Sequence, residues 1–428
     1  MWHRLRAIAR AIAFDLTPLR ISRDFRLIYI GQAVSFLGSM VTYVAVPYQV
    51  YALTGSTLAV GLLGAAELGP MLAMALVGGA LADAHDRRRM VLLAEAGLSI
   101  CCALLAANAA LARPSVPAVF VLAGLMAGLG GLHRPALEAM TPRLLGRDLM
   151  PAAAALHSFR GNLGMIAGPA IGGLLISHAG MTATYGFDLA TFVVSLAALA
   201  FVANIPPPEG AERPGLSAIR EGLRYAASRP LLLGTYVVDL NAMIFGMPMA
   251  LFPAIAQWHG GSRVVGLLYS APAVGALAVT VTSGWTRRVE RHGLAVAIAA
   301  AVWGAGIIGF GLAQSLWVSL AWLAVAGGAD MVSGLFRSTI WNQTIPDRLR
   351  GRLAGIEQIS YLSGPLLGHL EAGLVAALAG IRVSVVSGGA LAMLGSVLIS
   401  WRLPAFTGYR AAPAGQSASD AATRSSVT

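Results

Sequence analysis

Three acidic side chains stand inside long apolar stretches of the sequence, where a charge is costly. Counting about 1.5 Å of rise per helical residue places Glu67, Asp239 and Asp330 near the middle of their stretches. A charge in hydrocarbon costs several kcal/mol, so a charged side chain kept there is a candidate for function. Burial disfavours the ionised form of a carboxyl group, which lets it take up and release a proton near neutral pH. These three residues are therefore candidates for proton coupling.

Other ionisable side chains fit proton exchange less well. Arginine stays charged in proteins and cannot pass a proton on. Histidine could do so, but His133, His157, His178 and His369 fall toward the ends of the apolar stretches or in loops. The carboxyl groups therefore remain the expected carriers.

Each carboxylate has a simpler alternative, which is a fixed ion pair that only holds helices together. Arg337 follows Asp330 by two helical turns and so lies on the same face. Glu67 has a possible partner in Arg160, which is also placed near the middle of an apolar stretch. Arg160 and Arg337 are thus expected to be charges of an internal cavity or of such pairs.

The composition indicates which elements hold these groups. Apolar residues make up 57% of the 428 residues and charged residues 11%, against about a quarter charged in soluble domains. Apolar runs of about 20 residues mark membrane-spanning helices, the form that satisfies the backbone in lipid. The sequence predicts an all-α membrane protein with twelve spans, at 27–51, 57–82, 89–111, 116–140, 151–176, 182–204, 231–256, 264–285, 294–313, 317–340, 354–378 and 383–404.

The arginines predict the orientation of the spans. All 30 basic residues are arginine, and most lie in the terminal segments and in the loops on the same side of the membrane. The opposite loops hold only Arg113, Arg263 and Arg382. Because positive residues stay inside, we expect a multi-pass protein of the cell membrane with both termini in the cytoplasm. Their place in short loops also argues against nucleic-acid binding.

A polar segment divides the spans six and six. It opens with three prolines at 206–208, and Ser217–Ser228 has the pattern of an amphipathic helix on the membrane surface. The predicted parts are a cytoplasmic segment 1–26, a six-helix half 27–204, a central cytoplasmic loop 205–230, a second six-helix half 231–404, and a disordered cytoplasmic tail 405–428.

The two halves carry related motifs. Gly168-Pro169 in span five is matched by Gly364-Pro365 in span eleven, and Arg134 in span four is matched by Arg337 in span ten. Related halves around a central loop are typical of secondary transporters.

A motif after span two resembles the loop signature of the major facilitator superfamily. It consists of Gly79, Asp83, Arg87 and Arg88, and we call it the gate motif. The glycine permits close approach of two helix ends, and the aspartate can cap a neighbouring helix N-terminus. The resemblance implies that the motif holds the cytoplasmic side shut.

The gate motif departs from the family pattern at two positions. Ala84 replaces the usual basic residue, and Asp86 replaces the usual second glycine. Asp86 is therefore expected either to loosen the gate or to pair with the arginine run. An ordinary basic cytoplasmic turn is the alternative.

Span five resembles the motif that marks antiporters within this superfamily. It carries Gly164, Gly168, Pro169, Gly172 and Gly173. Small residues four apart permit close helix packing, and proline bends a helix. Plain glycine packing is the alternative, but the full pattern favours an antiporter.

Longer stretches narrow the resemblance. Residues 23–27, 141–148, 266–272 and 348–352 are similar to the bacterial enterobactin-exporter and Tap-type drug-efflux branch, and the similarity runs over 21–404. It implies efflux of a siderophore or drug-like molecule driven by proton entry, by a protein expected to be a monomer. Inward transport of a sugar or other nutrient is the alternative, which the span-five motif disfavours.

In the fold that the resemblance implies, spans one, four, seven and ten line a central cavity. Asp239 and Asp330 then lie on cavity helices, which favours them over Glu67. A small organic substrate needs apolar walls with few polar groups. The candidates for that lining, each of which could instead be packing, are Gln32, Ser35, Tyr43, Met243, Phe245 and Phe336.

The sequence lacks the motifs of other function classes. It contains no His-x-x-x-His metal motif and no phosphate-binding nucleotide loop. We therefore expect no metal, no cofactor and no enzymatic activity. The expected partners are the lipid bilayer, protons and the transported molecule.

The orientation can be tested at the central loop. A cysteine placed at Ser217 should resist impermeant thiol reagents in intact cells, because the loop is expected in the cytoplasm. It should react after the cells are opened. Ready labelling from outside would overturn the orientation.

Overall fold

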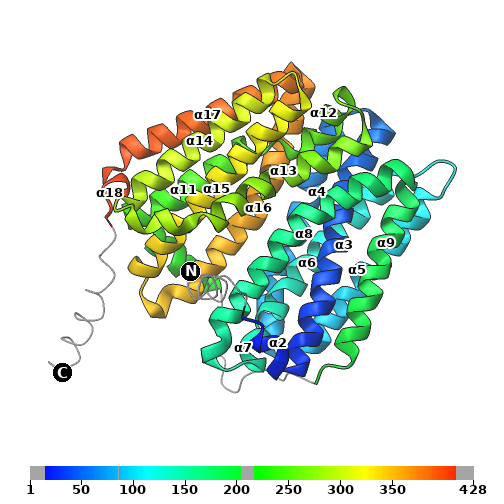
Figure 1. Cartoon of the computed structure of the whole chain (residues 1–428), viewed down its shortest axis with the longest axis horizontal. Coiled ribbons are helices and arrows are strands. Elements are labelled where there is room, and N and C mark those ends of the chain that lie inside the picture. Colours follow the sequence, from blue (N-terminus) through cyan, green and yellow to red (C-terminus); the bar gives the residue numbers. More distant parts are fainter. Residues whose placement is uncertain (1–14, 85, 204–215, 411–428) are drawn as a thin grey trace, which may run out of the picture. The chain divides into compact units, whose positions relative to one another are not determined.

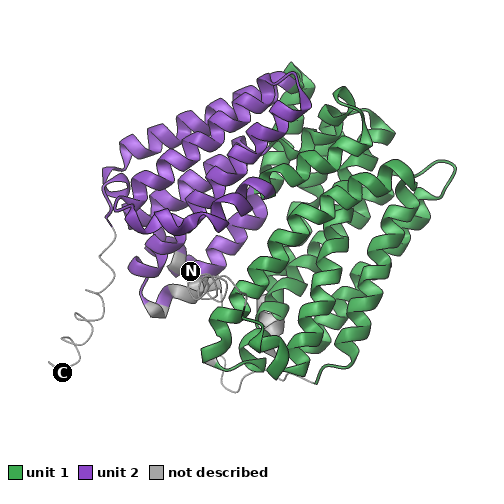
Figure 2. Ribbon diagram, in the orientation of Figure 1, with its two compact units in different colours: residues 1–214, 248–273, 365–381 green, residues 215–247, 274–364, 382–428 purple. Residues whose placement is uncertain are grey.

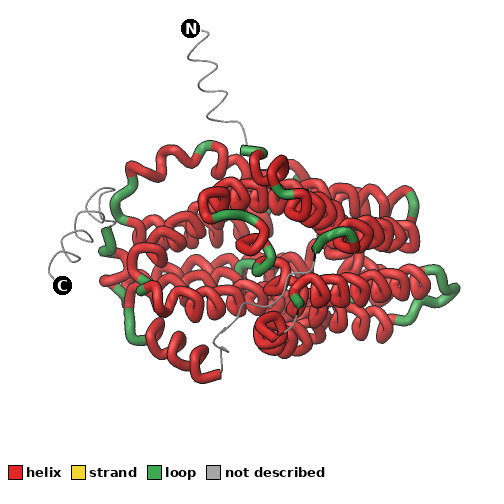
Figure 3. Tube along the Cα trace, turned by 90° about the horizontal axis from the view of Figure 1, so that it is seen from below, coloured by secondary structure: helices red, strands yellow, loops and turns green. Residues whose placement is uncertain are grey.

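The computed structural model describes residues 15–84, 86–203 and 216–410, without the side chains at 79–84, 147, 216–219, 222, 347, 348 and 350–352. These residues form helices joined by short loops, with no strand among them (Figures 1 and 3). Through the first half the helices are α2 (Thr17–Ile21), α3 (Arg23–Thr54), α4 (Thr57–Ala84), α5 (Arg87–Ala109), α6 (Val116–Glu138), α7 (Thr141–Leu144), η1 (Arg147–Leu149), α8 (Met150–His178) and α9 (Gly180–Ala200).

The second half has more interruptions. Its helices are α10 (Leu216–Ala227), α11 (Pro230–Phe245), η2 (Pro248–Leu251), α12 (Phe252–Trp258), α13 (Ser262–Val281), η3 (Ser283–Arg288), α14 (His292–Leu312), α15 (Leu316–Thr344), α16 (Asp347–Ala379), α17 (Ile381–Arg402) and α18 (Pro404–Thr407). Helix α10 confirms the helix predicted at 217–228; its place on the membrane surface stays a prediction.

The described residues contain twelve helices long and apolar enough to cross a membrane, as the sequence predicts. Each predicted edge lies within four residues of the edge in the structure. Span seven is the exception in form, because α11 stops at Phe245 and a 3-10 turn leads into α12. Pro248 has no N–H to donate to the preceding turn, and the regular helix ends just before it.

Local signals set several helix ends. Ser22 and Ser115 accept hydrogen bonds from backbone N–H groups in the first turns of α3 and α6. Gly180 and Gly380 adopt positive φ angles of 80° and 96° in the turns after α8 and α16. These two turns occupy the same place in the two halves, between spans five and six and between spans eleven and twelve.

The chain forms two compact units (Figure 2), which do not coincide with the two halves of the sequence. Unit 1 contains 1–214, 248–273 and 365–381, and unit 2 contains 215–247, 274–364 and 382–428. Three spans therefore contribute to both units. Within spans seven, eight and eleven the chain changes unit at or near a proline, at Pro248, Pro272 and Pro365.

Close helix contacts build each unit. In unit 1, α3 packs against α8 and α9, α4 against α6, and α5 against α6 and α9. In unit 2, α14 packs against α15, and the fully buried Phe406 of α18 lies against α11 and α14. Glycines permit this packing; a side chain at Gly234 would run into the ring of Phe406.

Gly38 is the tightest position between α3 and α9. A Cβ atom there would overlap the hydroxyl of Thr191 and the carboxylate of Asp188. Gly38→Ala is expected to destabilise the protein by about 1–3 kcal/mol, the usual cost of overpacking a core. Gly69→Ala on α4 is the matched control, because no atom lies within 4 Å of its Cβ position. Thermal unfolding in detergent should separate the two variants; equal midpoints would contradict the tight contact.

Candidate functional site: membrane-embedded carboxylates and a pocket

A buried ion pair joins α11 to α15 in unit 2. Asp239 and Arg337, which are 8% and 5% exposed, form a salt bridge. The guanidinium carbon of Arg337 also lies 5.9 Å from the centre of the Trp341 ring. Trp341 is held in turn by a hydrogen bond from its Nε1 to the hydroxyl of Thr235, at 2.9 Å. The pair is thus fixed by packing on both helices.

Asp330 stands apart from this pair. It lies on α15 and interacts electrostatically with Arg337 and Asp239. Within the described part of the chain it makes no hydrogen bond or ion pair. The sequence left open a fixed pair of Arg337 with Asp330, but the structure pairs Arg337 with Asp239. Arg337 therefore neutralises Asp239, while Asp330 has no hydrogen-bond or ion-pair partner among the described residues.

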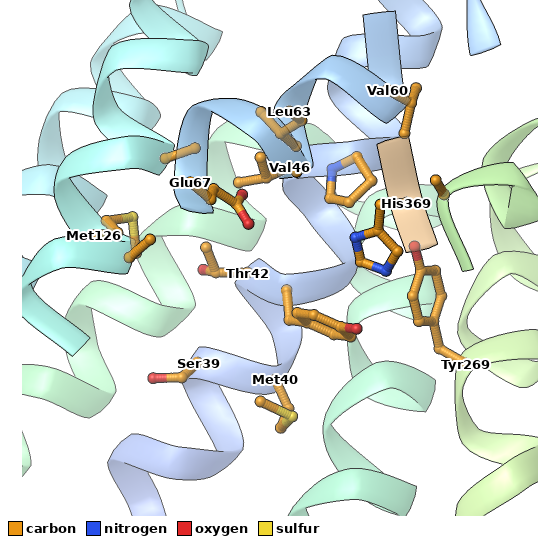
Figure 4. Close-up of a pocket in the computed structure, with 16 residues that line it drawn as sticks. Ser39, Met40, Thr42, Val46, Val60, Leu63, Glu67, Met126, Tyr269 and His369 are labelled. Atoms are coloured by element: carbon orange, nitrogen blue, oxygen red, sulfur yellow. The ribbon is translucent and has the colours of Figure 1, made fainter. Parts of the chain in front are cut away.

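Glu67 lines a pocket in unit 1 (Figure 4). The volume open to a water-sized molecule is about 190 Å³. Most of the wall is apolar, and Glu67 is the only acidic residue in it. The lining residues are Ser39, Met40, Thr42, Tyr43, Val46, Pro47, Val60, Leu63, Gly64, Glu67, Ala123, Met126, Ala127, Ala250, Tyr269 and His369.

Two predictions from the sequence concern residues of this pocket, the pairing of Glu67 and the position of His369. No ion pair joins Glu67 to Arg160 in the described residues, and the Nε and Nη1 atoms of Arg160 are buried without hydrogen-bond partners there. The prediction that places His369 toward the end of a span is wrong. His369 lies ten residues before the end of α16 at Ala379, well inside the helix, as the bounds of the predicted span 354–378 already imply, and it lines the pocket.

A buried polar cluster around Glu95 was not predicted. Glu95 is fully buried and accepts hydrogen bonds from Gln32 Nε2 at 2.5 Å and Ser195 Oγ at 3.0 Å. Nε2 of His133 lies 3.4 Å from the same carboxylate oxygen. The cluster joins four helices of unit 1. Placement of Glu95 near the end of its span hid it from a search for charges at mid-membrane.

A second cluster surrounds Asp188. Its carboxylate accepts hydrogen bonds from Thr42 at 2.5 Å, from the Cys102 thiol at 3.1 Å and from Thr191 at 3.2 Å. Asp188 is fully buried. Three donors to one carboxylate satisfy it without a cation, so Asp188 joins α3, α5 and α9 as a structural group.

Of the six residues predicted to line a substrate cavity, Tyr43 lines the pocket of unit 1. Gln32 belongs to the Glu95 cluster, and Ser35 is 4% exposed. Met243 is buried against Gly364. Phe336 packs in the core of unit 2, and Phe245 is half-buried at the end of α11. Lining of a substrate cavity by the other five residues stays a prediction.

The gate motif is described in part. At Gly79 and Asp83 the structure describes the backbone alone. Arg87 donates to the carbonyl of Ala139 at 3.0 Å, and Arg88 donates to the carbonyls of Leu199 and Ala200 at 3.0 and 2.7 Å. The arginines thus bind backbone carbonyls at the ends of α6 and α9, where a cation is favoured.

Asp86 explains one departure of the gate motif from the family pattern. Its side chain accepts a hydrogen bond from the Arg89 N–H at 2.9 Å and caps α5. The aspartate thus orders the start of the helix that carries the arginine run.

The span-five motif packs α8 against two other helices. Side chains added at Gly164, Gly168 and Gly172 would meet Phe36, Met40 and Val41 of α3. Gly173 approaches α13 instead, where its Cβ position lies 2.9 Å from the backbone nitrogen of Gly266. The glycines are therefore close-contact positions on two faces of one helix.

The ion pair can be tested by a double-mutant cycle. Asp239→Asn leaves Arg337 buried without a counter-charge and is expected to cost about 3–5 kcal/mol. Asp239→Asn combined with Arg337→Gln removes both charges and should recover much of that loss. Glu290→Gln is the control, since Glu290 is exposed and 3.9 Å from Arg410. With Arg337→Gln alone as the second single variant of the cycle, thermal unfolding midpoints in detergent measure all four variants. Additive losses in the double variant would contradict a coupled pair.

Comparison with known proteins places the chain in a family. The profile described as transmembrane secretion effector matches residues 13–420. The enterobactin exporter EntS of Citrobacter koseri is 31% identical over 389 residues, which cover 90% of this chain and 93% of that protein. The EntS of an Escherichia coli strain is 32% identical over 410 residues, covering 95% and 98%.

Solved structures show the same fold at low identity. The nucleoside transporter NupG superposes with a TM-score of 0.68 at 13% identity, over 90% of this chain and 98% of that one. A bacterial homologue of the iron transporter ferroportin, in an inward-facing state, gives 0.67 at 14% identity, over 87% and 97%. Together with the twelve spans and the glycine motifs, these matches show that the chain belongs to the transmembrane secretion effector family of the major facilitator superfamily.

Proposed function

We propose that this chain is a secondary transporter that exports a siderophore across the cell membrane in exchange for entering protons. The relatives that cover nearly the whole chain are named enterobactin exporters. Export is also the direction favoured by the span-five glycine motif, whose close packing is present on α8. We place both termini in the cytoplasm and expect a monomer to be the working unit.

The observation that carries proton coupling is the unequal state of Asp239 and Asp330, which both interact with Arg337. Asp239 is paired with the arginine, and Asp330 has no such partner in the described chain. If Asp239, Asp330 and Arg337 were all ionised, they would leave one uncompensated negative charge in a membrane interior, which is costly. Glu357 of α16 also interacts with Arg337 and Asp239, and its ionised form would add to that charge. A proton on one carboxyl group removes that charge.

This arrangement supports Asp330 as the proton carrier and Arg337 as the group that senses it. When Asp330 loses its proton, the arginine faces two carboxylates instead of one. The attraction that holds Asp239 is then shared, and α11 and α15 are held together differently. A change of helix packing that depends on a proton is what coupling requires.

The alternatives concern cargo and direction. A drug-like compound is compatible with the same coupling, and the pocket of unit 1 does not distinguish the two classes by size. Inward transport of a sugar or other nutrient is the weaker candidate, because the relatives are named exporters.

Coupling can be measured in inside-out vesicles with an acidic interior, using enterobactin as cargo. Asp330→Asn should abolish proton-driven uptake, because the side chain can no longer exchange a proton. Downhill exchange of cargo should survive, since the substitution keeps the shape of the side chain. The same assay is run on Asp239→Asn and Glu67→Gln, with cargo-induced proton release as the direct readout.

Glu290→Gln is the matched control, because this carboxylate is exposed outside the spans. It should leave proton release unchanged. If all three membrane carboxylates can be neutralised without loss of coupling, the assignment to these groups is wrong. If Glu67→Gln alone uncouples transport, the proton path runs through unit 1.

A further inference from the structure

We infer that the pocket of unit 1 binds a single aromatic ring that carries hydroxyl groups, as one arm of the exported molecule. The inference rests on the proposed function for the identity of the cargo, but the pocket and its chemistry stand by themselves. The lining comes from α3, α4, α6, η2, α13 and α16, all within unit 1.

Size and wall chemistry point to one ring. An apolar cavity of about 150 Å³ holds a benzene molecule, and this pocket offers about 190 Å³. Tyr43 and Tyr269 form one wall, with ring centres 5.5 Å apart and planes at 78°. Met40 and Met126 also line the space (Figure 4), and thioethers make favourable contacts with aromatic rings. The whole cargo would not fit, so an arm is the occupant.

The carboxylate of Glu67 favours a ligand that donates hydrogen bonds. Glu67 projects into the pocket (Figure 4) and has no hydrogen bond or ion pair in the described residues. Its carboxylate can accept two hydroxyl hydrogens at once. The tyrosine hydroxyls do not compete for it. Tyr269 donates to the carbonyl of Met249 at 2.9 Å, and the Tyr43 hydroxyl lies 3.5 Å from the Met249 sulfur.

His369 decides between a hydroxylated ring and a cation. An organic ammonium ion only donates, so it would satisfy Glu67 but could bond to Nε2 of His369 only when that nitrogen carries no hydrogen, whereas a hydroxyl group donates and accepts. Nε2 of His369 is buried without a partner in the described part of the chain, and an unmade hydrogen bond there is costly. Hydroxyl groups on a ring can donate to the carboxylate and also exchange a hydrogen bond with the imidazole. The hydroxylated ring can therefore bond to both Glu67 and His369.

The pocket wall explains why the space stays open to a ring. Gly64 of α4 lies against α16, and a Cβ atom there would come within 2.5 Å of the Leu366 carbonyl and 3.0 Å of His369 Cβ. The backbone contact holds α16 at a fixed separation from α4. Glu67, one turn further along α4, and His369 are thereby kept beside the same space.

The test measures binding of three ring probes to the purified full-length chain in lipid nanodiscs at pH 8. Catechol, 2-phenylethylammonium and toluene share one aromatic ring and differ in hydroxyl, charge and apolar character. Ligand-detected NMR titration gives each affinity. Catechol should bind most tightly, and Glu67→Gln should weaken it at least about tenfold, since a hydrogen bond to a charged acceptor is lost.

Two further variants make the result specific. Ala127→Leu keeps Glu67 but fills the pocket and should abolish catechol binding. Glu290→Gln removes an exposed carboxylate in unit 2 and should leave binding unchanged. The inference fails if toluene binds as tightly as catechol, if 2-phenylethylammonium binds more tightly, or if Glu67→Gln or Ala127→Leu has no effect.

Transport separates this inference from the proposed function. In inside-out vesicles, Glu67→Gln should raise the enterobactin concentration needed for half-maximal uptake while proton release per cargo stays the same. If the chain moves enterobactin but catechol does not bind, the ring site is wrong and export stands. If catechol binds with the stated specificity and no enterobactin moves, the ring site stands and the cargo is wrong.

Discussion

The cost of a bare charge in a low-dielectric interior governs how polar side chains are arranged in this protein. Among the described residues, the most deeply buried carboxylates each have polar partners. Asp239 has Arg337, Asp188 has three donors, and Oε1 of Glu95 has Gln32, Ser195 and His133, whereas its Oε2 has no partner there. Glu67 and Asp330 depart from this pattern, and a group left without partners in such a setting is available for a proton or a ligand.

The spans were predictable because hydrocarbon thickness and backbone hydrogen bonding leave few choices for an apolar run of about 20 residues. The sequence also located the motifs, since glycine and proline act locally. It did not predict the break in span seven, although Gly246 and Pro248 are visible there. Proline also lies inside α3, α4, α8, α13 and α16, where the helix continues. Tertiary packing decides which prolines end a helix.

The candidate site was predictable only as a set of residues. Counting along the spans found Glu67, Asp239 and Asp330, but depth in a span does not tell which helix faces which. Arg337 was therefore matched with Asp330 on its own helix, whereas its partner Asp239 lies on α11. Gln32 was assigned to a substrate wall for the same reason. Its rotation about α3 turns it to Glu95, and depth along the span does not give that rotation.

The prolines at the three unit crossings have a mechanical consequence. Pro248, Pro272 and Pro365 each remove one hydrogen bond from the helical ladder. A helix that lacks one backbone hydrogen bond bends most easily at that turn, so the neighbouring turns carry little strain. In spans seven, eight and eleven these turns are therefore the places where bending is expected to cost least, and they lie at or near the points where the chain passes from one unit to the other.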